Sequence, residues 1–177
     1  MLAQVNEILV KKGLMLKTGT VVDATIPAPS STKNNSGTRD PEMRQTQKSD
    51  NWCFGMKAHI GVDVESGLVH TVVGTAGNVH DITEAHALLH GQETDVYADS
   101  GYQGIEKRRE TGAVRWHIVM RPVKRKKLNL SDRLDAIYDQ IERLKTLYRG
   151  LMKNTGQITT LFALSNLWMA RRALRKA

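Results

Sequence analysis

The sequence predicts an α/β fold in which a mixed β-sheet is flanked by helices. The elements support this fold class, because a strand and a hairpin come first and alternating strands and helices follow. Apolar residues make up 40% of the 177 residues, which is enough for a core, and the 5% share of aromatic residues predicts that this core is aliphatic. A chain of this length suits one domain.

The first part of the chain predicts one helix, one strand and a loop. Residues 5–16 have the apolar spacing of a short amphipathic helix. Apolar and β-branched residues at 20–26 predict a strand that ends at Pro27. Residues 27–51 are polar and show no apolar period, so we expect a long polar loop there, and loops of this length are usually functional or disordered.

A hairpin and a helix are predicted next. Two strand-like runs, 54–64 and 68–75, are separated by Glu65-Ser66-Gly67, and a Ser-Gly pair between apolar runs is typical of a hairpin. Asp81 is suited to cap a helix that continues to about residue 90.

The second half alternates strand and helix. Residues 94–98 predict a short strand with Asp99 at its end, and a tight turn at 100–104 follows. After a short charged helix, residues 116–120 predict the last strand. The C-terminal region 131–177 predicts helices, of which the final one, 155–175, is apolar nearly all round and is therefore expected to be largely buried.

The charge is divided unevenly along the chain. Residues 1–106 hold 8 Lys/Arg and 13 Asp/Glu, a balance of −5, whereas residues 107–177 hold 18 Lys/Arg and 5 Asp/Glu, a balance of +13. A strongly basic half attracts polyanions, of which nucleic acid is the commonest. A merely solvated charged surface is the alternative.

The compartment expected from the sequence is the cytoplasm. The one cysteine, Cys53, allows no disulfide within the chain, which fits a reducing environment. No secretory signal is visible, and no segment is long and apolar enough for a membrane helix, so we expect no membrane partner.

Two aspartates are placed where a carboxylate is unusual. Asp23 lies within an apolar strand, and Asp99 ends a later strand. A buried carboxylate is costly unless it is paired or binds a metal, and carboxylates are ligands that Mg²⁺ prefers. Bonding of Asp23 to backbone amides and ordinary turn chemistry at Asp99 remain the alternatives.

Several motifs, in the right order, resemble the DDE domain of bacterial insertion-sequence transposases of the IS-four or IS-five type. The resemblance begins at about Gly19 and covers nearly the whole chain. Its motifs are Val22-Asp23-Ala24-Thr25, Ser31-Thr32-Lys33-Asn34, Arg39-Asp40-Pro41-Glu42-Met43, residues 54–63, Gly77-Asn78-Val79-His80-Asp81, residues 99–104, residues 148–154 and residues 161–168.

The resemblance implies an RNase H-like fold over residues 19–177 and Mg²⁺-dependent (or Mn²⁺-dependent) cleavage and joining of DNA at a two-metal site. It implies that Asp23 and Asp99 are the first two catalytic and metal-binding aspartates. It also implies transposon ends and target DNA as partners, with an intact transposase or a second copy as a further one. The basic run Lys124, Arg125, Lys126 and Lys127 is suited to backbone phosphates.

The chain departs from the family pattern in two places. Only about twenty residues precede Asp23, so we interpret residues 1–18 as the remnant of a longer helical region. The pattern Tyr-x2-Arg-x3-Glu-x6-Lys, which carries the family's third acid, is absent, as an internal deletion near residues 144–148 explains. The metal site is therefore expected to be incomplete.

We expect from this a transposase-derived protein that binds DNA without cleaving it. Two alternatives stay open. One is an active metal-dependent nuclease or transposase in which Glu142 replaces the missing acid. The other is the non-functional product of a decaying gene.

Overall fold

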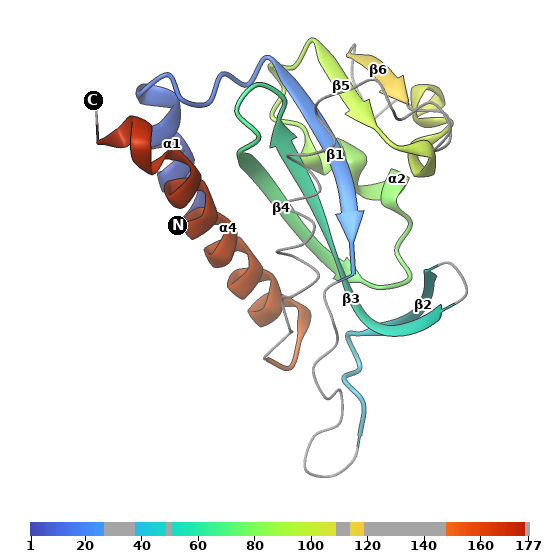
Figure 1. Cartoon of the computed structure of the whole chain (residues 1–177). Helices are drawn as coiled ribbons and strands as arrows, with labels where there is room; N and C mark the ends of the chain where they lie inside the picture. Colours follow the sequence, from blue (N-terminus) through green and yellow to red (C-terminus); the bar gives the residue numbers. More distant parts are fainter. Residues whose placement is uncertain (27–37, 49–50, 109–113, 119–147, 176–177) are drawn as a thin grey trace.

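A computed structural model describes residues 1–26, 38–48, 51–108, 114–118 and 148–175 (Figure 1). Six strands of the described residues form one sheet in the order β2-β3-β1-β5-β6, and β4 also pairs with β3. The strands are β1 (Gly19–Thr25), β2 (Arg44–Lys48), β3 (Asn51–Asp63), β4 (Val69–Ala76), β5 (Asp95–Ala98) and β6 (Arg115–Ile118). β3 is antiparallel to β1, β2 and β4, whereas β5 is parallel to β1 and β6. The mixed sheet of the predicted RNase H-like fold class is confirmed.

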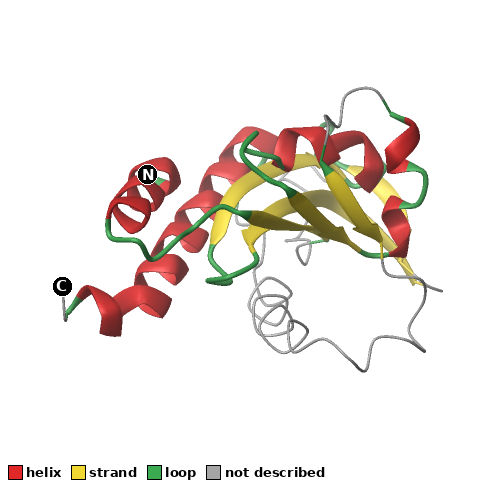
Figure 2. Ribbon diagram, turned by 90° about the horizontal axis from the view of Figure 1, so that it is seen from above, coloured by secondary structure: helices red, strands yellow, loops and turns green. Residues whose placement is uncertain are grey.

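Helices lie on both faces of this sheet. They are α1 (Leu2–Lys11), α2 (Asp81–Glu84) and α4 (Leu151–Leu174), with short 3₁₀ turns η1 (Ala85–Leu88), η2 (Ser100–Tyr102) and η3 (Ile105–Lys107). Consecutive residues of a strand point to opposite faces. On β1, Val21 belongs to a core shared with α1 and α4, and Val22 to a second core shared with η1 and η2. Figure 2 shows this layering from above.

Buried polar contacts fix α4 against the sheet. The amide of Asn166 accepts a hydrogen bond from the Val69 N–H (3.1 Å) and donates to the Val69 carbonyl (2.7 Å) and to Asn6 Oδ1 of α1 (3.0 Å). Nearby, a side chain at Gly74 of β4 would collide with Thr155 of α4. The helix therefore approaches the strand as closely as a glycine allows.

The 39–43 motif holds the beginning of α4. Asp40 accepts a hydrogen bond from the Gly150 N–H (2.6 Å), and Glu42 accepts one from the Leu151 N–H (2.5 Å). The first N–H groups of a helix have no partner within it, and negative charge is favoured there. These two acids consequently anchor α4 to a segment more than a hundred residues earlier.

Several sequence predictions differ from the structure. β2 lies inside the stretch 27–51 that was predicted to be a polar loop. Its residues Arg44-Gln45-Thr46-Gln47-Lys48 show no apolar alternation, and they become a strand because the start of β3 offers backbone partners. The helix predicted from Asp81 to about residue 90 is only one turn of α-helix followed by the 3₁₀ turn η1.

The prediction that the final helix is largely buried was wrong. Phe162 and Ala163 are buried, but Trp168 is 64% exposed and Met152 is 84% exposed. Among the described helices and strands, α4 packs mainly on β4 and α1, and Trp168 and Met152 on its other side stay exposed there. None of the helices in the described parts of the chain could cross a membrane.

Candidate functional site

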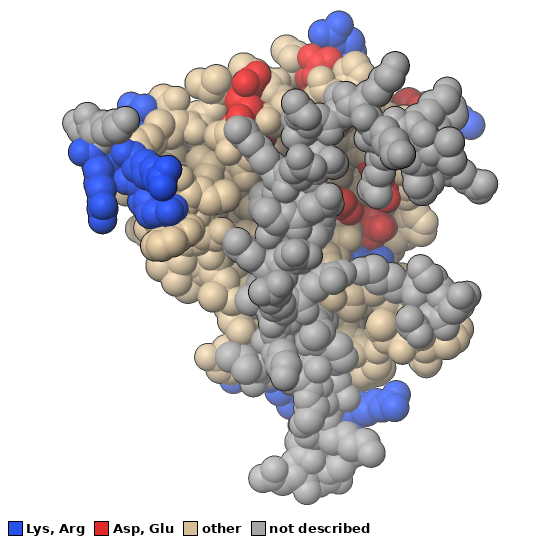
Figure 3. Space-filling model, viewed as in Figure 1, with Lys and Arg blue, Asp and Glu red and all other residues tan. Residues whose placement is uncertain are grey.

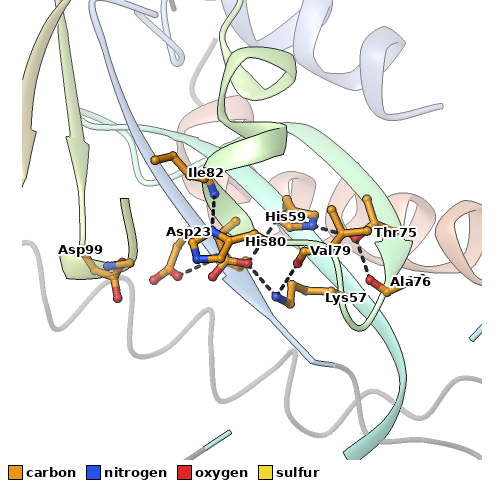
Figure 4. A network of polar contacts seen from close by, with 12 residues as sticks. Asp23, Lys57, His59, Thr75, Ala76, Val79, His80, Ile82 and Asp99 are labelled. Atoms are coloured by element: carbon orange, nitrogen blue, oxygen red, sulfur yellow. Dashed lines mark hydrogen bonds and ion pairs between the residues drawn. The ribbon is translucent and has the colours of Figure 1, made fainter. Parts of the chain in front are cut away.

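The parallel pairing of β1 with β5 brings the two predicted aspartates to one edge of the sheet. The paired register of these two strands ends at Val22 opposite Ala98. One further step along the same register sets Asp23 opposite Asp99, and neighbouring strands are about 4.8 Å apart. Paired residues of adjacent strands point to the same face, so both carboxylates are directed to the same side. Figure 4 shows them approaching each other from the two strands.

The turn after β5 fixes the carboxylate of Asp99. Its side chain accepts a hydrogen bond from the Gly101 N–H at 2.8 Å and so caps the turn η2. A Cβ at position 101 would lie 3.0 Å from Asp99 Oδ1, closer than side chains normally approach. A glycine at 101 is therefore required if Asp99 is to keep this position. At Asp23, the Ala24 N–H donates to Oδ1 at 2.6 Å.

A third aspartate, Asp81, faces the same turn from the start of α2. Its Oδ2 lies 3.8 Å from the position that a Cβ on Gly101 would occupy, so Asp81 and Asp99 both border that point. Its Oδ1 forms an ion pair of 2.8 Å with the ammonium of Lys57, which also donates to the Val79 carbonyl at 2.8 Å. The Lys57 side chain is only 13% exposed, so solvent screens this pair weakly. Lys57 thus fixes one oxygen of the Asp81 carboxylate.

His59 completes the network behind Asp81. Its ring is buried, with Nε2 at 2.8 Å from the Thr75 hydroxyl and Nδ1 at 3.9 Å from Asp81 Oδ1. Burial is the main reason that the pKa of His59 falls to about 4, and the opposing effect of Asp81 is smaller. The Thr75 hydroxyl donates to the Ala76 carbonyl, so Nε2 of a neutral His59 carries the ring proton and Nδ1 is an acceptor. Nδ1 has no hydrogen-bond partner among the described residues.

Tyr102 places a second buried polar atom without a partner at this edge. The side chain is fully buried, and no described group hydrogen-bonds to its hydroxyl. The pKa of Tyr102 is raised above its usual range, first by burial and then by the negative charges of Asp23, Asp81 and Asp99. The phenol is therefore within electrostatic reach of all three carboxylates. A buried hydroxyl without a partner is costly, which indicates that something else satisfies it in the working protein.

The donor chemistry of this edge fits a hard divalent cation. Three carboxylates and a hydroxyl offer only oxygen, which Mg²⁺ and Mn²⁺ prefer. In the described parts of the chain, no three Asp, Glu, His or Cys side chains are already assembled closely enough to enclose an ion. An ion at this edge is thus expected to keep several of its own waters.

From the sequence, Asp23 and Asp99 were proposed for the site, Asp81 was expected only to cap a helix, Tyr102 only to shape the turn after Asp99, and Lys57 had no role. A signal was present, because Asp81 follows β4 at the first position of a helix and Tyr102 lies in the turn after Asp99. The sequence could not show which loops lie together in the fold. The fold brings Asp81 and Tyr102 to the edge of the sheet where β1 and β5 end.

The predicted DNA-contacting residues Lys124, Arg125, Lys126 and Lys127 lie outside the described residues, as does Glu142. Within the described part, basic side chains gather over the ends of α1 and α4, at the left of Figure 3. This group includes Lys11, Lys12, Arg171, Arg172 and Arg175. Acidic side chains appear in several separate places, at the top edge where β1 and β5 begin and near the ends of these strands (Figure 3).

Comparison with known proteins gave two results. A family model described as the transposase DDE domain matches residues 15–162. Among solved structures, this chain is similar to a chain in the crystal structure of the Mos1 strand transfer complex, with a TM-score of 0.45 and 14% sequence identity. The match covers 96% of this chain and 55% of that one, so this chain spans about half the length of that protein.

Proposed function

Because this chain belongs to the transposase DDE domain family, we propose that it is a transposase-derived DNA-binding protein that retains a divalent metal site but does not cleave DNA. The observation that carries the metal site is the parallel register of β1 and β5, which directs Asp23 and Asp99 to the same side of one sheet edge.

In this proposal Asp23 and Asp99 hold Mg²⁺ or Mn²⁺. Two carboxylates close together repel each other, and a divalent cation relieves that repulsion. The chemistry that such ions supply in two-metal sites is activation of a water or hydroxyl and stabilisation of the leaving oxygen at a phosphate. The residues around them keep the geometry, since Gly101 leaves room for the Asp99 carboxylate and donates its N–H to it.

The absence of strand cleavage follows from the missing third acid. The Tyr-x2-Arg-x3-Glu-x6-Lys pattern is not found in the sequence. Without that glutamate a second ion would lack a ligand, so we expect Asp23 and Asp99 to bind a metal without supporting cleavage.

DNA binding rests on charge. The half of the chain from residue 107 has a balance of +13, from 18 Lys/Arg and 5 Asp/Glu. Contacts of lysine and arginine with phosphates give affinity without sequence information. We propose transposon ends and target DNA as ligands, an intact transposase or a second copy of this chain as a protein partner, and the cytoplasm as the location.

A plasmid-nicking assay tests the lack of cleavage. Supercoiled plasmid is incubated with purified protein and Mg²⁺ or Mn²⁺, beside Asp99→Asn as the matched control. We expect equal, background nicking from both proteins. Robust nicking by the wild type that Asp99→Asn abolishes would show an active enzyme. If Glu142→Gln also abolished this nicking, residue 142 would be the replacement acid.

Fluorescence anisotropy with a labelled duplex tests DNA binding. Affinity is expected to fall steeply with salt, with a log–log slope of about −0.9 for each phosphate contacted. Alanine at Lys124, Arg125, Lys126 and Lys127 should weaken binding and make that slope shallower. The control removes four charges elsewhere, at Lys11, Lys12, Arg172 and Arg175, and is expected to have the smaller effect. Salt-independent affinity would contradict phosphate binding.

A further inference from the structure

We infer that Asp81 is a positioning residue of the metal site, binding through its Oδ2 a water carried by the ion that Asp23 and Asp99 hold. This inference rests on the proposed metal site. It assigns to the first residue of α2 a role that the family match and the sequence motifs leave open.

The two carboxylate oxygens of Asp81 have different surroundings. Oδ1 is bound by the Lys57 ammonium at 2.8 Å, and this contact sets the rotation of the carboxylate. Oδ2 is then turned toward the η2 turn. A Cβ added to Gly101 would lie 3.8 Å from Asp81 Oδ2 and 3.0 Å from Asp99 Oδ1, so both oxygens border the same point. An acceptor is thus directed at the place where waters on an ion beside Asp99 would lie.

The separation favours a water-mediated contact over direct ligation. The three aspartates are not assembled as an enclosing metal-ligand set among the described residues. Mg²⁺ keeps several waters and commonly uses only one or two protein carboxylates. Groups that bind such outer positions typically change metal affinity by about 10–100-fold when they are removed.

Tyr102 gives the second, independent observation. Its hydroxyl is fully buried, lacks a partner among the described groups and is within electrostatic reach of Asp23, Asp81 and Asp99, in the turn that Asp99 caps. Waters on an ion at this edge would satisfy that hydroxyl and Asp81 Oδ2 together. An acidic cluster with a purely structural role would leave the hydroxyl unsatisfied.

Lys57 explains how Asp81 remains in place without an ion. Its ammonium neutralises one of three neighbouring negative charges and is itself held by the Val79 carbonyl at 2.8 Å. The Lys57 ammonium therefore balances the charge of the Asp81 carboxylate, and only Oδ2 of this carboxylate is directed at the site. This arrangement also makes a charge-matched test possible.

The test is a Mn²⁺ titration of the full chain, followed by the electron paramagnetic resonance signal of free Mn²⁺. The key variant is Lys57→Met with Asp81→Ala, which removes one charge of each sign and therefore keeps the local net charge. We expect it to bind Mn²⁺ at least about tenfold more weakly than the wild type. Wild-type affinity in this double variant would overturn the inference, because charge alone would then suffice.

A second variant covers the case in which the double variant does not fold. In Asp81→Asn, Lys57 attracts the amide oxygen, so the NH₂ group faces the site and cannot accept a hydrogen bond from water. The same loss of about tenfold is expected, and unchanged affinity would overturn the inference. Asp95→Asn is the matched control, because Asp95 is at the opposite end of β5 from Asp99; its affinity should equal that of the wild type.

The outcomes separate this inference from the proposed function. If the wild type binds no Mn²⁺, or if Asp23→Asn and Asp99→Asn bind as well as the wild type, the metal site itself is refuted. If those two variants lose binding while both Asp81 variants keep it, only the role of Asp81 is refuted.

Discussion

Two groups of acidic residues in this protein have different surroundings. At the start of α4, Asp40 and Glu42 each accept a hydrogen bond from a helix N–H group, at 2.6 and 2.5 Å. At the ends of β1 and β5, the acids Asp23, Asp81 and Asp99 all act electrostatically on Tyr102, whose buried hydroxyl has no partner among the described residues.

The difference separates structural acids from acids that await a ligand. Carboxylates that meet N–H donors stabilise the fold in every condition where they are charged. Asp23 and Asp99 also accept a backbone N–H, but they lie with Asp81 at one sheet edge, where repulsion between the carboxylates offsets that gain until a cation joins them. Removing Asp40 should therefore lower stability, whereas neutralising Asp99 should leave stability unchanged or raise it.

The largest effect is expected at the polar contact that holds α4. Asn166→Ala leaves the Val69 N–H and Asn6 Oδ1 without this partner in a buried place, at a cost of about 3 kcal/mol. Urea unfolding measures this loss. Mn²⁺ affinity of the folded protein should not change, and a parallel loss of Mn²⁺ binding would mean that α4 and the metal site are coupled.

Acid pH should lower the free energy of unfolding through His59, which lies behind the strand ends. Burial lowers its pKa from 6.5 to about 4, so the unfolded chain binds more protons between these values. The contribution of neutral His59 to the free energy of unfolding is fully present above about pH 6.5. It is lost as the pH falls to about 4, and this loss is on the order of 2 kcal/mol. His70, whose pKa burial also lowers to about 4, acts in the same direction. His59→Gln should flatten the pH dependence of unfolding over this window, and an unchanged slope would contradict the assignment.

At the α4 anchor we expect a moderate effect. Asp40→Ala removes the acceptor of the Gly150 N–H and should destabilise the protein by about 1–2 kcal/mol, as loss of a helix cap does. Thermal unfolding with and without Mn²⁺ is the measurement. The increase in Tm that Mn²⁺ gives should be the same as in the wild type.

The smallest effect on stability is expected at the strand ends themselves. Asp99→Asn keeps an oxygen for the Gly101 N–H and removes one of the neighbouring negative charges. Without metal, its Tm should equal that of the wild type or exceed it slightly, by the equivalent of about 0.5 kcal/mol. Addition of Mn²⁺ should no longer raise the Tm. A clear loss of metal-free stability would place Asp99 with the structural acids.

The sequence was most informative where local pattern decides the structure. The apolar runs and the Ser66-Gly67 turn predicted the β3–β4 hairpin, and the strand ends placed Asp23 and Asp99. β2 could not be predicted, because its polar residues form a strand only through pairing with β3. The exposed face of α4 was missed because apolar residues around a helix do not reveal how many neighbours cover it.

Long-range contacts explain the rest of what the sequence could not show. Asp40 and Glu42 belong to a motif that the sequence analysis quoted, but their partners at Gly150 and Leu151 follow only from the fold. Likewise Lys57 and Asp81 are 24 residues apart and meet because α2 begins beside β3.

Crystals of the protein soaked in Mn²⁺ offer the most direct measurement, using the anomalous scattering of the metal. The account predicts an anomalous peak bordered by the carboxylates of residues 23 and 99, which disappears in crystals of Asp99→Asn. Crystals saturated with Mn²⁺ that show no peak between these two side chains, or a peak that survives the substitution, would contradict it.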